Sequence, residues 1–145
     1  MFAGYTPTIK VPGAVPHPTQ LVEPAAMAVV KLPKTTYKPS LPERVIKSGA
    51  VSDAQLEQVV LAGEAHSQNL PNGERSGYFI GDGTGVGKGR TIAAVILDNQ
   101  NQGRRTAVWV SKTGSLVNDA KRDCGDVGIN PDTVLSFSGS KKVTK

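Results

Sequence analysis

The sequence predicts an α/β protein in which helices flank a parallel sheet, as an incomplete three-layer arrangement preceded by an extended proline-rich arm. Three observations predict this class. Strand-like and helix-like segments alternate from residue 77 onward, a glycine-rich turn joins the first of these strands directly to a helix, and eight of the ten prolines fall within the first 42 residues. The 145 residues are enough to bury the core of one domain.

The arm is predicted over residues 1–48, where proline recurs from Pro7 to Pro42. Proline has no backbone N–H donor and biases the residue before it toward extended conformations, so regular structure is disfavoured there. We expect this arm to be either flexible or laid across the surface of a partner. The remainder, residues 49–145, is predicted to be the globular part.

A helix is predicted over residues 52–66. Ser52 is a candidate N-cap, Gln55 stands three residues later as its capping-box partner, and Val51 with Leu56 is placed as a hydrophobic staple. Apolar residues then follow at helical spacing. The next stretch, residues 70–77, has the proline, asparagine and glycine content of a loop.

The segments after this loop predict parallel strands joined by helices. Ser115 is the candidate cap of the second of these helices, whose Val117, Ala120 and Cys124 share one face. Trp109 lies in an apolar strand and is predicted to belong to the core. In chain order, the prediction is a strand at 77–81, a helix at 88–102, a strand at 105–110, a helix at 114–128, a turn at 130–132 and a strand at 133–137.

The formal net charge of +5 is unevenly distributed along the chain. Residues 1–48 hold six Lys and Arg against two Glu, the last five residues add three lysines, and residues 49–140 carry eight basic against ten acidic side chains. Basicity therefore lies in the tails. Solvated tails explain it as well as a nucleic-acid site does.

The single cysteine, Cys124, excludes an internal disulfide and a multi-cysteine metal site, and it fits a reducing, cytoplasmic location. His17 and His66 have no nearby partners for metal binding. The longest apolar run, Ala25 to Val30, is far shorter than the roughly 18 residues of a membrane helix, so no membrane insertion is expected. No secretory signal is readable at the N-terminus.

The stretch GDGTGVGKGR at residues 81–90 carries the clearest chemistry. It does not fit a dinucleotide fingerprint, which needs glycines at i, i+2 and i+5. It fits the phosphate-binding pattern G-x-x-x-x-G-K-[ST] with two departures, Asp82 for the first glycine and Gly89 for the hydroxyl residue. Backbone N–H groups at the helix start would hold phosphates, and Lys88 would reach the terminal ones. The alternative is a structural glycine turn.

A more specific resemblance rests on the same residues. The opening DGTGVGK resembles motif I of superfamily 2 helicases and SWI/SNF-like remodellers, in which an acid opens the loop. Together with IAAVILDN, GRRTAVWVSK and DAKRD, it resembles the P-loop region of strawberry notch proteins and their phage and plasmid relatives, in which Gly follows the lysine as a rule. The upstream HPTQLVEPAAMAVV and SDAQLEQVVLAGEAH resemble the flank of bacterial and phage members, so the resemblance covers residues 17–128.

This resemblance implies that residues 49–145 are the N-terminal portion of a RecA-like P-loop NTPase lobe, which binds ATP and Mg²⁺ in a helicase-like motor. Lys88 would be the catalytic residue, with Asp82 opening the loop. Arg90 is a further nucleotide-binding candidate that could help neutralise phosphate, and a solvent-facing helix arginine is the favoured alternative. The residues that match motif I and would wrap the phosphates are Gly83, Thr84, Gly85, Val86, Gly87, Lys88 and Gly89.

Gly89 lacks the hydroxyl that usually binds Mg²⁺ in a P-loop. Either a water or Thr91 would then supply the oxygen, and water is favoured because Thr91 should point elsewhere on the helix. Gln55 matches the glutamine that reads adenine in superfamily 2 enzymes, with its capping-box role as the alternative.

Ser111, Lys112 and Thr113 stand in the loop that touches the nucleic-acid backbone in this class of motor. The alternative is a polar loop that caps the next helix. The expected partners are DNA, the second lobe of the motor, and a protein that receives the proline-rich arm.

Hydrolysis of ATP needs an acidic motif II at the end of a later strand, and no predicted strand outside the P-loop is followed by Asp or Glu. The chain is therefore interpreted as the front portion of a longer enzyme, which by itself binds ATP weakly and hydrolyses it negligibly. Two alternative functions remain, a small P-loop phosphotransferase and a non-catalytic nucleotide-binding interaction module.

Overall fold

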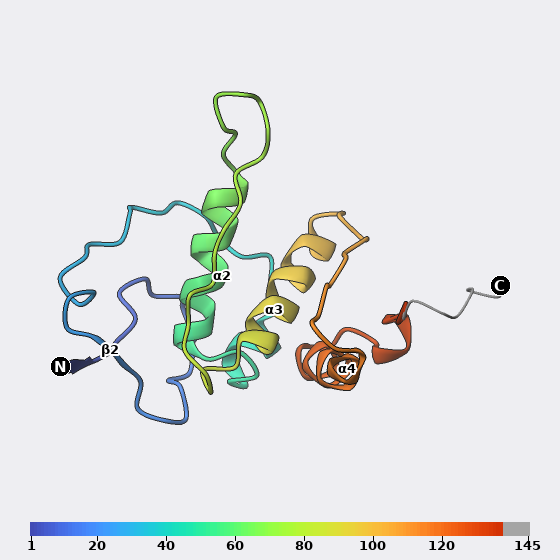
Figure 1. Cartoon of the computed structure of the whole chain (residues 1–145), viewed down its shortest axis with the longest axis horizontal. Coiled ribbons are helices and arrows are strands. Elements are labelled where there is room, and N and C mark those ends of the chain that lie inside the picture. Colours follow the sequence, from blue (N-terminus) through green and yellow to red (C-terminus); the bar gives the residue numbers. More distant parts are fainter. Residues whose placement is uncertain (138–145) are drawn as a thin grey trace.

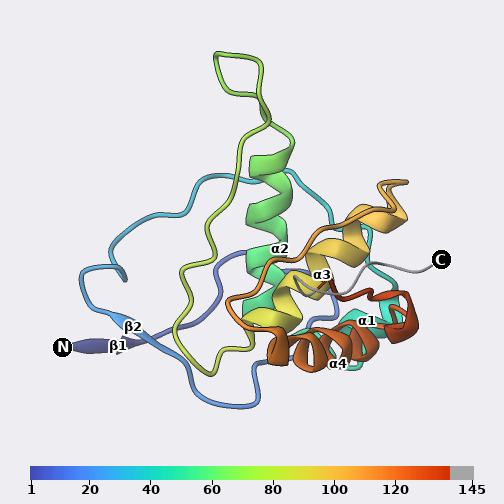
Figure 2. The same ribbon diagram turned by 45° about the vertical axis from the view of Figure 1, so that its right-hand side comes forward.

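The computed structural model describes residues 1–137, and Figures 1 and 2 show helices packed side by side with a long irregular arm around them. No helix in this part of the chain has the length and apolar character to cross a membrane. The last three lysines, Lys141, Lys142 and Lys145, lie outside the described part. The elements are β1 (Phe2–Gly4), β2 (Val22–Pro24), α1 (Glu43–Lys47), α2 (Asp53–His66), α3 (Lys88–Asn101) and α4 (Val117–Val127), with short 3₁₀ helices η1 (Gly114–Leu116) and η2 (Pro131–Thr133).

The helix predicted over residues 52–66 is confirmed as α2, with both halves of its capping box. The Ser52 Oγ accepts a hydrogen bond from the Gln55 N–H at 3.4 Å, and the Gln55 Oε1 accepts one from the Ser52 N–H at 2.9 Å. Val51 and Leu56, the predicted staple, are fully buried. This end of α2 is therefore determined by local sequence.

The helices predicted over 88–102 and 114–128 are confirmed as α3 and α4, but the predicted cap at Ser115 is wrong. Ser115 lies inside η1, where its Oγ is 2.9 Å from the Thr113 Oγ1 and accepts from no amide of α4. The chain tightens into a 3₁₀ turn before α4 begins at Val117, a common way to enter a helix without a side-chain cap. Gly128, with φ of 93°, ends α4.

The predicted parallel sheet does not form among residues 1–137. The sheet found there is the antiparallel pair of β1 and β2, in which Phe2 faces Pro24. The predicted strands at 77–81, 105–110 and 133–137 run without a ladder, because an extended segment becomes a strand only where a neighbour offers N–H and C=O partners.

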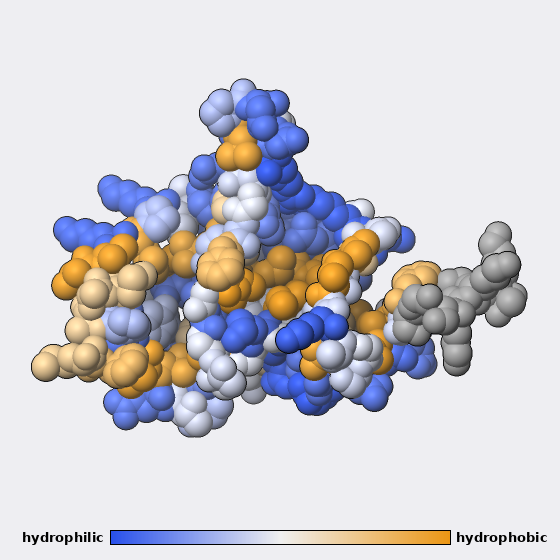
Figure 3. All heavy atoms as spheres, in the orientation of Figure 1, coloured by the Kyte–Doolittle hydropathy of each residue, from blue (hydrophilic) through white to orange (hydrophobic). Residues whose placement is uncertain are grey.

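The same three segments carry large apolar side chains on the surface. The exposed fractions are 87% for Phe79, Val108 and Val110, 69% for Leu135 and 73% for Phe137. Figure 3 shows apolar residues gathered across the middle of one face of the molecule. These segments therefore have the apolar side chains of buried strands, while the packing that would bury these side chains is absent from residues 1–137.

The core lies where α3 packs against both α2 and α4, with α1 beside them (Figure 2). Trp109 is partly buried against this core, which confirms its predicted place. The core also takes in Leu41 and Val45, which lie before the predicted boundary at residue 48. The arm is therefore not extended throughout, since residues 43–47 form α1.

The proline-rich arm is held against α2 by the buried carboxylate of Glu57. This side chain is 0% exposed and accepts hydrogen bonds from the N–H groups of Thr8 at 2.7 Å and Ile9 at 2.6 Å, and from the Tyr5 hydroxyl. Backbone amides of an irregular segment need acceptors, and here a side chain provides them. The negative charge of Glu57 is compensated by these donors rather than by a cation.

A second contact of the same kind fixes the later part of the arm. The Glu64 carboxylate accepts from the N–H groups of Thr36 and Tyr37, both at 2.8 Å. On α3, Asp98 accepts from the Tyr37 hydroxyl and the Ser40 N–H, both at 2.5 Å. The arm therefore packs across the helices of its own chain.

The acidic side chains of α2 that hold the arm share one face of the helix. Asp53, which accepts from the His17 N–H at 3.0 Å, stands four residues before Glu57 and eleven before Glu64. At about 100° per residue these positions fall within about 40° of one another. This spacing was visible in the sequence and is the signal that could have predicted the path of the arm.

Candidate functional site

The glycine-rich stretch at residues 81–90 forms an exposed turn that leads into α3. Gly85 and Gly87 have φ of 93° and 87°, in the left-handed region that glycine adopts without strain, and Gly87 is the N-cap of α3. These two glycines reverse the chain so that it enters the helix directly from the turn.

The backbone N–H groups of residues 83–90 donate to no protein oxygen within the part of the chain that the structure describes. They lie at the N-terminal, positive end of a 14-residue helix. Consecutive unpaired amides at such a position form a concave site for an anion. The donors that the sequence predicts for phosphate are therefore without protein acceptors among the described residues.

Lys88, the first residue of α3, turns its side chain back over the turn. Its Nζ donates to the carbonyl oxygens of Asp82 and Gly83, both at 2.9 Å. The ammonium group is therefore held beside the unpaired amides, where it adds a positive charge to the same site. Thr84, between these residues, is exposed.

Gln55 connects the start of α2 to the turn. Its Nε2 donates to the carbonyl oxygens of Val86 at 2.9 Å and Gly87 at 3.2 Å, while its Oε1 belongs to the capping box. A Cβ on Gly87 would lie 2.5 Å from this Nε2. Gln55 thus positions the turn through its side-chain amide. Its contact with adenine stays a prediction, and the amide would have to give up these bonds to make it.

Gly89 is a glycine because α4 approaches it closely. A Cβ at this position would overlap the Asp123 Oδ2, so no side chain fits without displacing this carboxylate. The absence of a hydroxyl after Lys88 therefore has a packing reason that lies 34 residues away in the sequence. Asp123, within the segment DAKRD, has no role predicted from the sequence.

Arg90 and Thr91 both turn away from the phosphate-binding turn. The Arg90 guanidinium donates to the Ala50 carbonyl at 3.2 Å and pairs with Asp126 of α4. Arg90 therefore connects α3 to α4, which differs from both the predicted phosphate contact and the predicted solvent-facing position. Thr91 is fully buried, with its Oγ1 3.4 Å from the Gly87 carbonyl. Thr91 therefore does not supply an oxygen to the turn, in agreement with the prediction.

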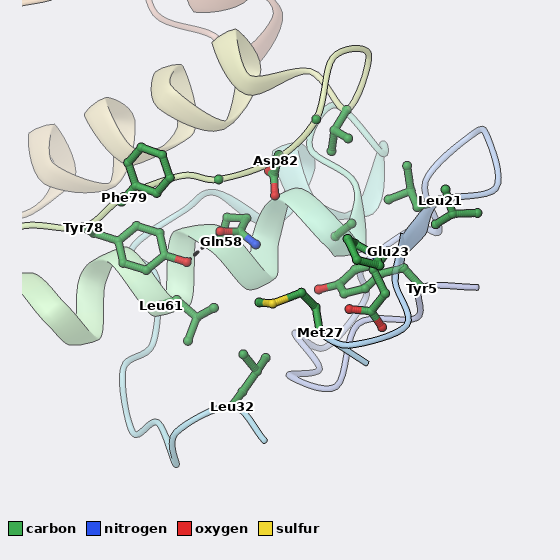
Figure 4. Close-up of a pocket in the computed structure, with 16 residues that line it drawn as sticks. Tyr5, Leu21, Glu23, Met27, Leu32, Gln58, Leu61, Tyr78, Phe79 and Asp82 are labelled. Atoms are coloured by element: carbon green, nitrogen blue, oxygen red, sulfur yellow. Dashed lines mark hydrogen bonds between the residues drawn. The ribbon is translucent and has the colours of Figure 1, made fainter. Parts of the chain in front are cut away.

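A cavity of about 340 Å³ opens beside the turn, between the arm, α2 and residues 78–83 (Figure 4). Its volume falls in the range of small-molecule sites, and its lining is mainly apolar. The Tyr78 hydroxyl donates to the Gln58 Oε1 at 2.7 Å on one wall, and Met27 and Leu32 come from the arm. No local pattern in the sequence predicts this cavity, because the arm residues that close it are far away in the sequence.

Asp82 lines this cavity and the turn at once. Its Oδ2 is buried without a hydrogen-bond partner among the described residues. Burial raises the pKa of Asp82, the charge of Lys88 lowers it, and the charge of Glu57 raises it. A buried acceptor without a donor costs about 1–3 kcal/mol, so a bound group that carried a donor would be stabilised here.

All three tyrosines hold their protons more tightly than a free phenol. Burial and the bond to Glu57 raise the pKa of Tyr5, and burial and the bond to Asp98 raise the pKa of Tyr37. Burial, with the negative charges of Asp82 and Glu57, raises the pKa of Tyr78 to about 12.

The free energy of unfolding is therefore expected to fall as the pH rises above about 10. The unfolded chain loses its phenolic protons near that pH, whereas the folded chain retains them, so alkali favours unfolding and these groups contribute fully at lower pH. Urea unfolding at pH about 8 and about 11 measures the loss, and Tyr78→Phe should reduce it. Tyrosinate absorbance that rose near pH 10 in the folded chain would contradict this prediction.

Ser111, Lys112 and Thr113 lie in an exposed loop before η1. The Thr113 Oγ1 is engaged with Ser115, and Lys112 forms no ion pair within residues 1–137. The same described residues hold no group of three or more His, Cys, Asp or Glu side chains that could bind a metal ion. A cation at the turn would need oxygens from a bound phosphate.

Comparison with known proteins agrees with this geometry. A family described as "P-loop containing NTP hydrolase pore-1" matches residues 16–145, which include the whole turn and the helix that it opens. The chain belongs to this family. No solved structure matches the chain significantly.

Relatives of this chain include strawberry notch proteins, and the chain is strawberry notch-like. It is 45% identical over 127 residues to the strawberry notch homolog of Caenorhabditis elegans, which covers 88% of this chain and 7% of that protein. It is 42% identical over 142 residues to FORGETTER 1 of Arabidopsis thaliana, which covers 94% of this chain and 11% of that protein. It is 43% identical over 140 residues to strawberry notch homolog 1 of Homo sapiens, which covers 97% of this chain and 10% of that protein. The chain spans about a tenth of the length of these relatives.

Proposed function

We propose that this chain binds ATP and Mg²⁺ as part of a helicase-like, DNA-associated ATPase of the strawberry notch type. The observation that carries the proposal is the run of unpaired amides at residues 83–90, at the positive end of α3 and beside the Lys88 ammonium. The amides would hold the triphosphate, and Lys88 would neutralise the charge that develops on its terminal group. Mg²⁺ would supply charge neutralisation across the phosphates, which would provide most of its ligands.

The base of the nucleotide is proposed to enter the cavity beside the turn. The phosphates and the base would then occupy adjoining sites that share Asp82, Gly83 and Val86. The exocyclic amino group of adenine is a donor that would satisfy the unpaired Asp82 Oδ2 once a rotation of the carboxylate turned this buried oxygen into the cavity, whereas guanine presents a carbonyl oxygen at the corresponding ring position. This chemistry favours ATP over GTP.

Calorimetric titration of the chain with ATP, GTP and inorganic tripolyphosphate tests the proposal. We expect saturable binding of ATP at one site, with GTP and tripolyphosphate each weaker by about tenfold. An equal affinity for tripolyphosphate and ATP would rule out the base site, and no heat with any of the three would rule out the anion site as well.

Hydrolysis is proposed to need residues beyond those of this chain. The three extended segments at 77–81, 105–110 and 133–137 are proposed to be strands of a RecA-like sheet that further strands complete, which would bury their exposed apolar side chains. An acidic motif II and a second lobe would then complete the ATPase. Cytoplasmic location and kinship with phage and plasmid members remain predictions.

Contact with DNA is proposed for the exposed loop at residues 111–113. Replacing Lys112 with alanine is expected to weaken binding to duplex DNA alike for all sequences, because a lysine on this loop would contact phosphate rather than bases. In anisotropy titrations at several salt concentrations, log affinity falls as log salt rises, and the magnitude of this slope should decrease by about 0.9 in Lys112→Ala. Lys47→Ala serves as the control, and an unchanged slope in Lys112→Ala would contradict a phosphate contact.

A further inference from the structure

The phosphate-binding turn of this chain lacks the oxygen ligand that Mg²⁺ usually receives from the residue after the lysine. That residue is Gly89, and Thr91 is buried with its hydroxyl directed at the Gly87 carbonyl. Neither residue can supply the oxygen. A water is the ligand predicted from the sequence, and the packing of α4 on α3 offers a different candidate.

Asp123 of α4 fills the space that a side chain at position 89 would occupy. A Cβ on Gly89 would overlap its Oδ2, so this carboxylate oxygen lies beside the first turn of α3, near the place of the missing hydroxyl. Asp123 is 8% exposed. The packing of α3 and α4 therefore restricts the position of this side chain more than a surface rotamer would be restricted.

The two oxygens of Asp123 have different surroundings. The Oδ1 accepts hydrogen bonds from the Arg122 Nε at 3.3 Å and Nη2 at 3.2 Å, and the Oδ2 accepts none from the described residues. One oxygen is thus held by a guanidinium group, while the other is spare and faces the N-terminal end of α3. A carboxylate held in this way is oriented before any ligand arrives.

We propose that the Asp123 Oδ2 replaces the missing P-loop hydroxyl as the protein ligand of the nucleotide-bound Mg²⁺. Mg²⁺ prefers hard oxygen ligands and is typically held by one or two carboxylates together with substrate phosphates, so a single spare carboxylate oxygen beside a triphosphate site fits this cation. The inference rests on the proposed binding of ATP. It assigns Asp123 a role that its partner Gly89 makes possible, because any side chain at 89 would displace the carboxylate.

The opposing explanation is purely structural. A carboxylate near the N-terminus of α3 interacts favourably with the helix dipole whether or not a cation binds. Such a role would make Asp123 equally important with and without Mg²⁺. A ligand of the cation would matter only when Mg²⁺ is present.

The test is calorimetric titration of the chain with ATP in excess EDTA and in Mg²⁺, for the wild type and Asp123→Asn. We expect Mg²⁺ to increase the ATP affinity of the wild type, and Asp123→Asn to lose about tenfold of this increase while its affinity in EDTA is unchanged or slightly higher. Asp119→Asn is the matched control, because Asp119 lies one turn earlier on α4 with a side chain 53% exposed, and it should behave as wild type.

A second variant transfers the ligand back to its usual place. In Gly89→Ser/Asp123→Ala the shortened residue 123 leaves room for the serine, whose hydroxyl should restore most of the Mg²⁺ effect. The electron paramagnetic resonance signal of Mn²⁺ with ATP should be altered by the wild type and the double variant, and much less by Asp123→Asn. If Asp123→Asn fails to fold by circular dichroism, the comparison of the double variant with Asp123→Ala decides.

Three results with the variants would overturn the inference. These are a Mg²⁺ effect that persists in Asp123→Asn, an equal loss of affinity with and without Mg²⁺, and a double variant that gains nothing over Asp123→Ala. A wild-type chain that binds ATP in EDTA but ignores Mg²⁺ would also exclude Asp123 as a ligand and leave the proposed ATP site intact. Absence of ATP binding under both conditions would instead remove the proposed function, and the inference with it.

Discussion

Lys88→Ala is expected to lower the affinity of the chain for ATP about a hundredfold, which corresponds to about 2.7 kcal/mol. The Lys88 ammonium is held over the turn by the carbonyl groups of Asp82 and Gly83, so it meets a bound triphosphate without a large rearrangement. A charged donor to a phosphate oxygen contributes about 1.5–3 kcal/mol. Calorimetric titration with ATP and with tripolyphosphate measures the loss, which should be similar for both ligands because Lys88 contacts only phosphate.

The fold of Lys88→Ala should remain intact. The two bonds that Lys88 forms lie at the partly exposed turn, so their loss should change the free energy of unfolding by less than about 1 kcal/mol. Lys47→Ala is the control for loss of a positive charge, because Lys47 lies on α1 in a surface pair with Glu43. An ATP affinity in Lys88→Ala equal to that of Lys47→Ala would show that the amides of the turn do not bind the triphosphate.

Glu57→Gln is expected to lower the free energy of unfolding by about 3 kcal/mol. Glutamine has the shape of glutamate, and its carbonyl oxygen can still accept from the amides of Thr8 and Ile9, which share Oε2. Its Nε2 then replaces the oxygen that accepts from the Tyr5 hydroxyl, and the charge that strengthens all three bonds is lost. The site is fully buried, so water cannot replace the lost acceptor. Urea unfolding followed by circular dichroism measures the change.

The control for Glu57→Gln is Glu43→Gln. The Glu43 side chain is 82% exposed and pairs with Lys47 one turn away at 3.0 Å, so its removal should cost no more than about 0.5 kcal/mol. Release of the arm gives an independent measurement, since trypsin should cleave after Lys10 faster in Glu57→Gln than in the control. Equal unfolding midpoints and equal cleavage rates would mean that Glu57 does not hold the arm.

Local sequence predicted the helices well because their signals act over a few residues. Ser52 and Gln55 are three residues apart and satisfy each other's amides, and the glycines before Lys88 allow the left-handed conformations that start α3. Such contacts form whatever the rest of the chain does. The same holds for the unpaired amides of the turn, which follow from its order of residues.

Predictions that needed distant partners were less successful. Ser115 has the chemistry of an N-cap, but the chain enters α4 through a 3₁₀ turn that leaves this side chain without an amide to accept from. The three predicted strands have the apolar alternation of strands, but pairing depends on neighbours that residues 1–137 do not provide. The carboxylates of Glu57 and Glu64 gave no local sign that they would bind the arm, apart from their common helix face.

By itself, the sequence determined the limits of α2 and α3, the turn with unpaired amides at residues 83–90 and the place of Lys88 at the start of α3, because each depends on residues close together in the chain. The tertiary structure alone decided that the arm lies on its own helices, that a cavity opens beside the turn, and that Asp123 takes the space above Gly89. These contacts join residues far apart in the chain, such as Thr8 and Glu57, which are 49 positions apart. Packing in three dimensions brings such groups together, and no local pattern specifies it.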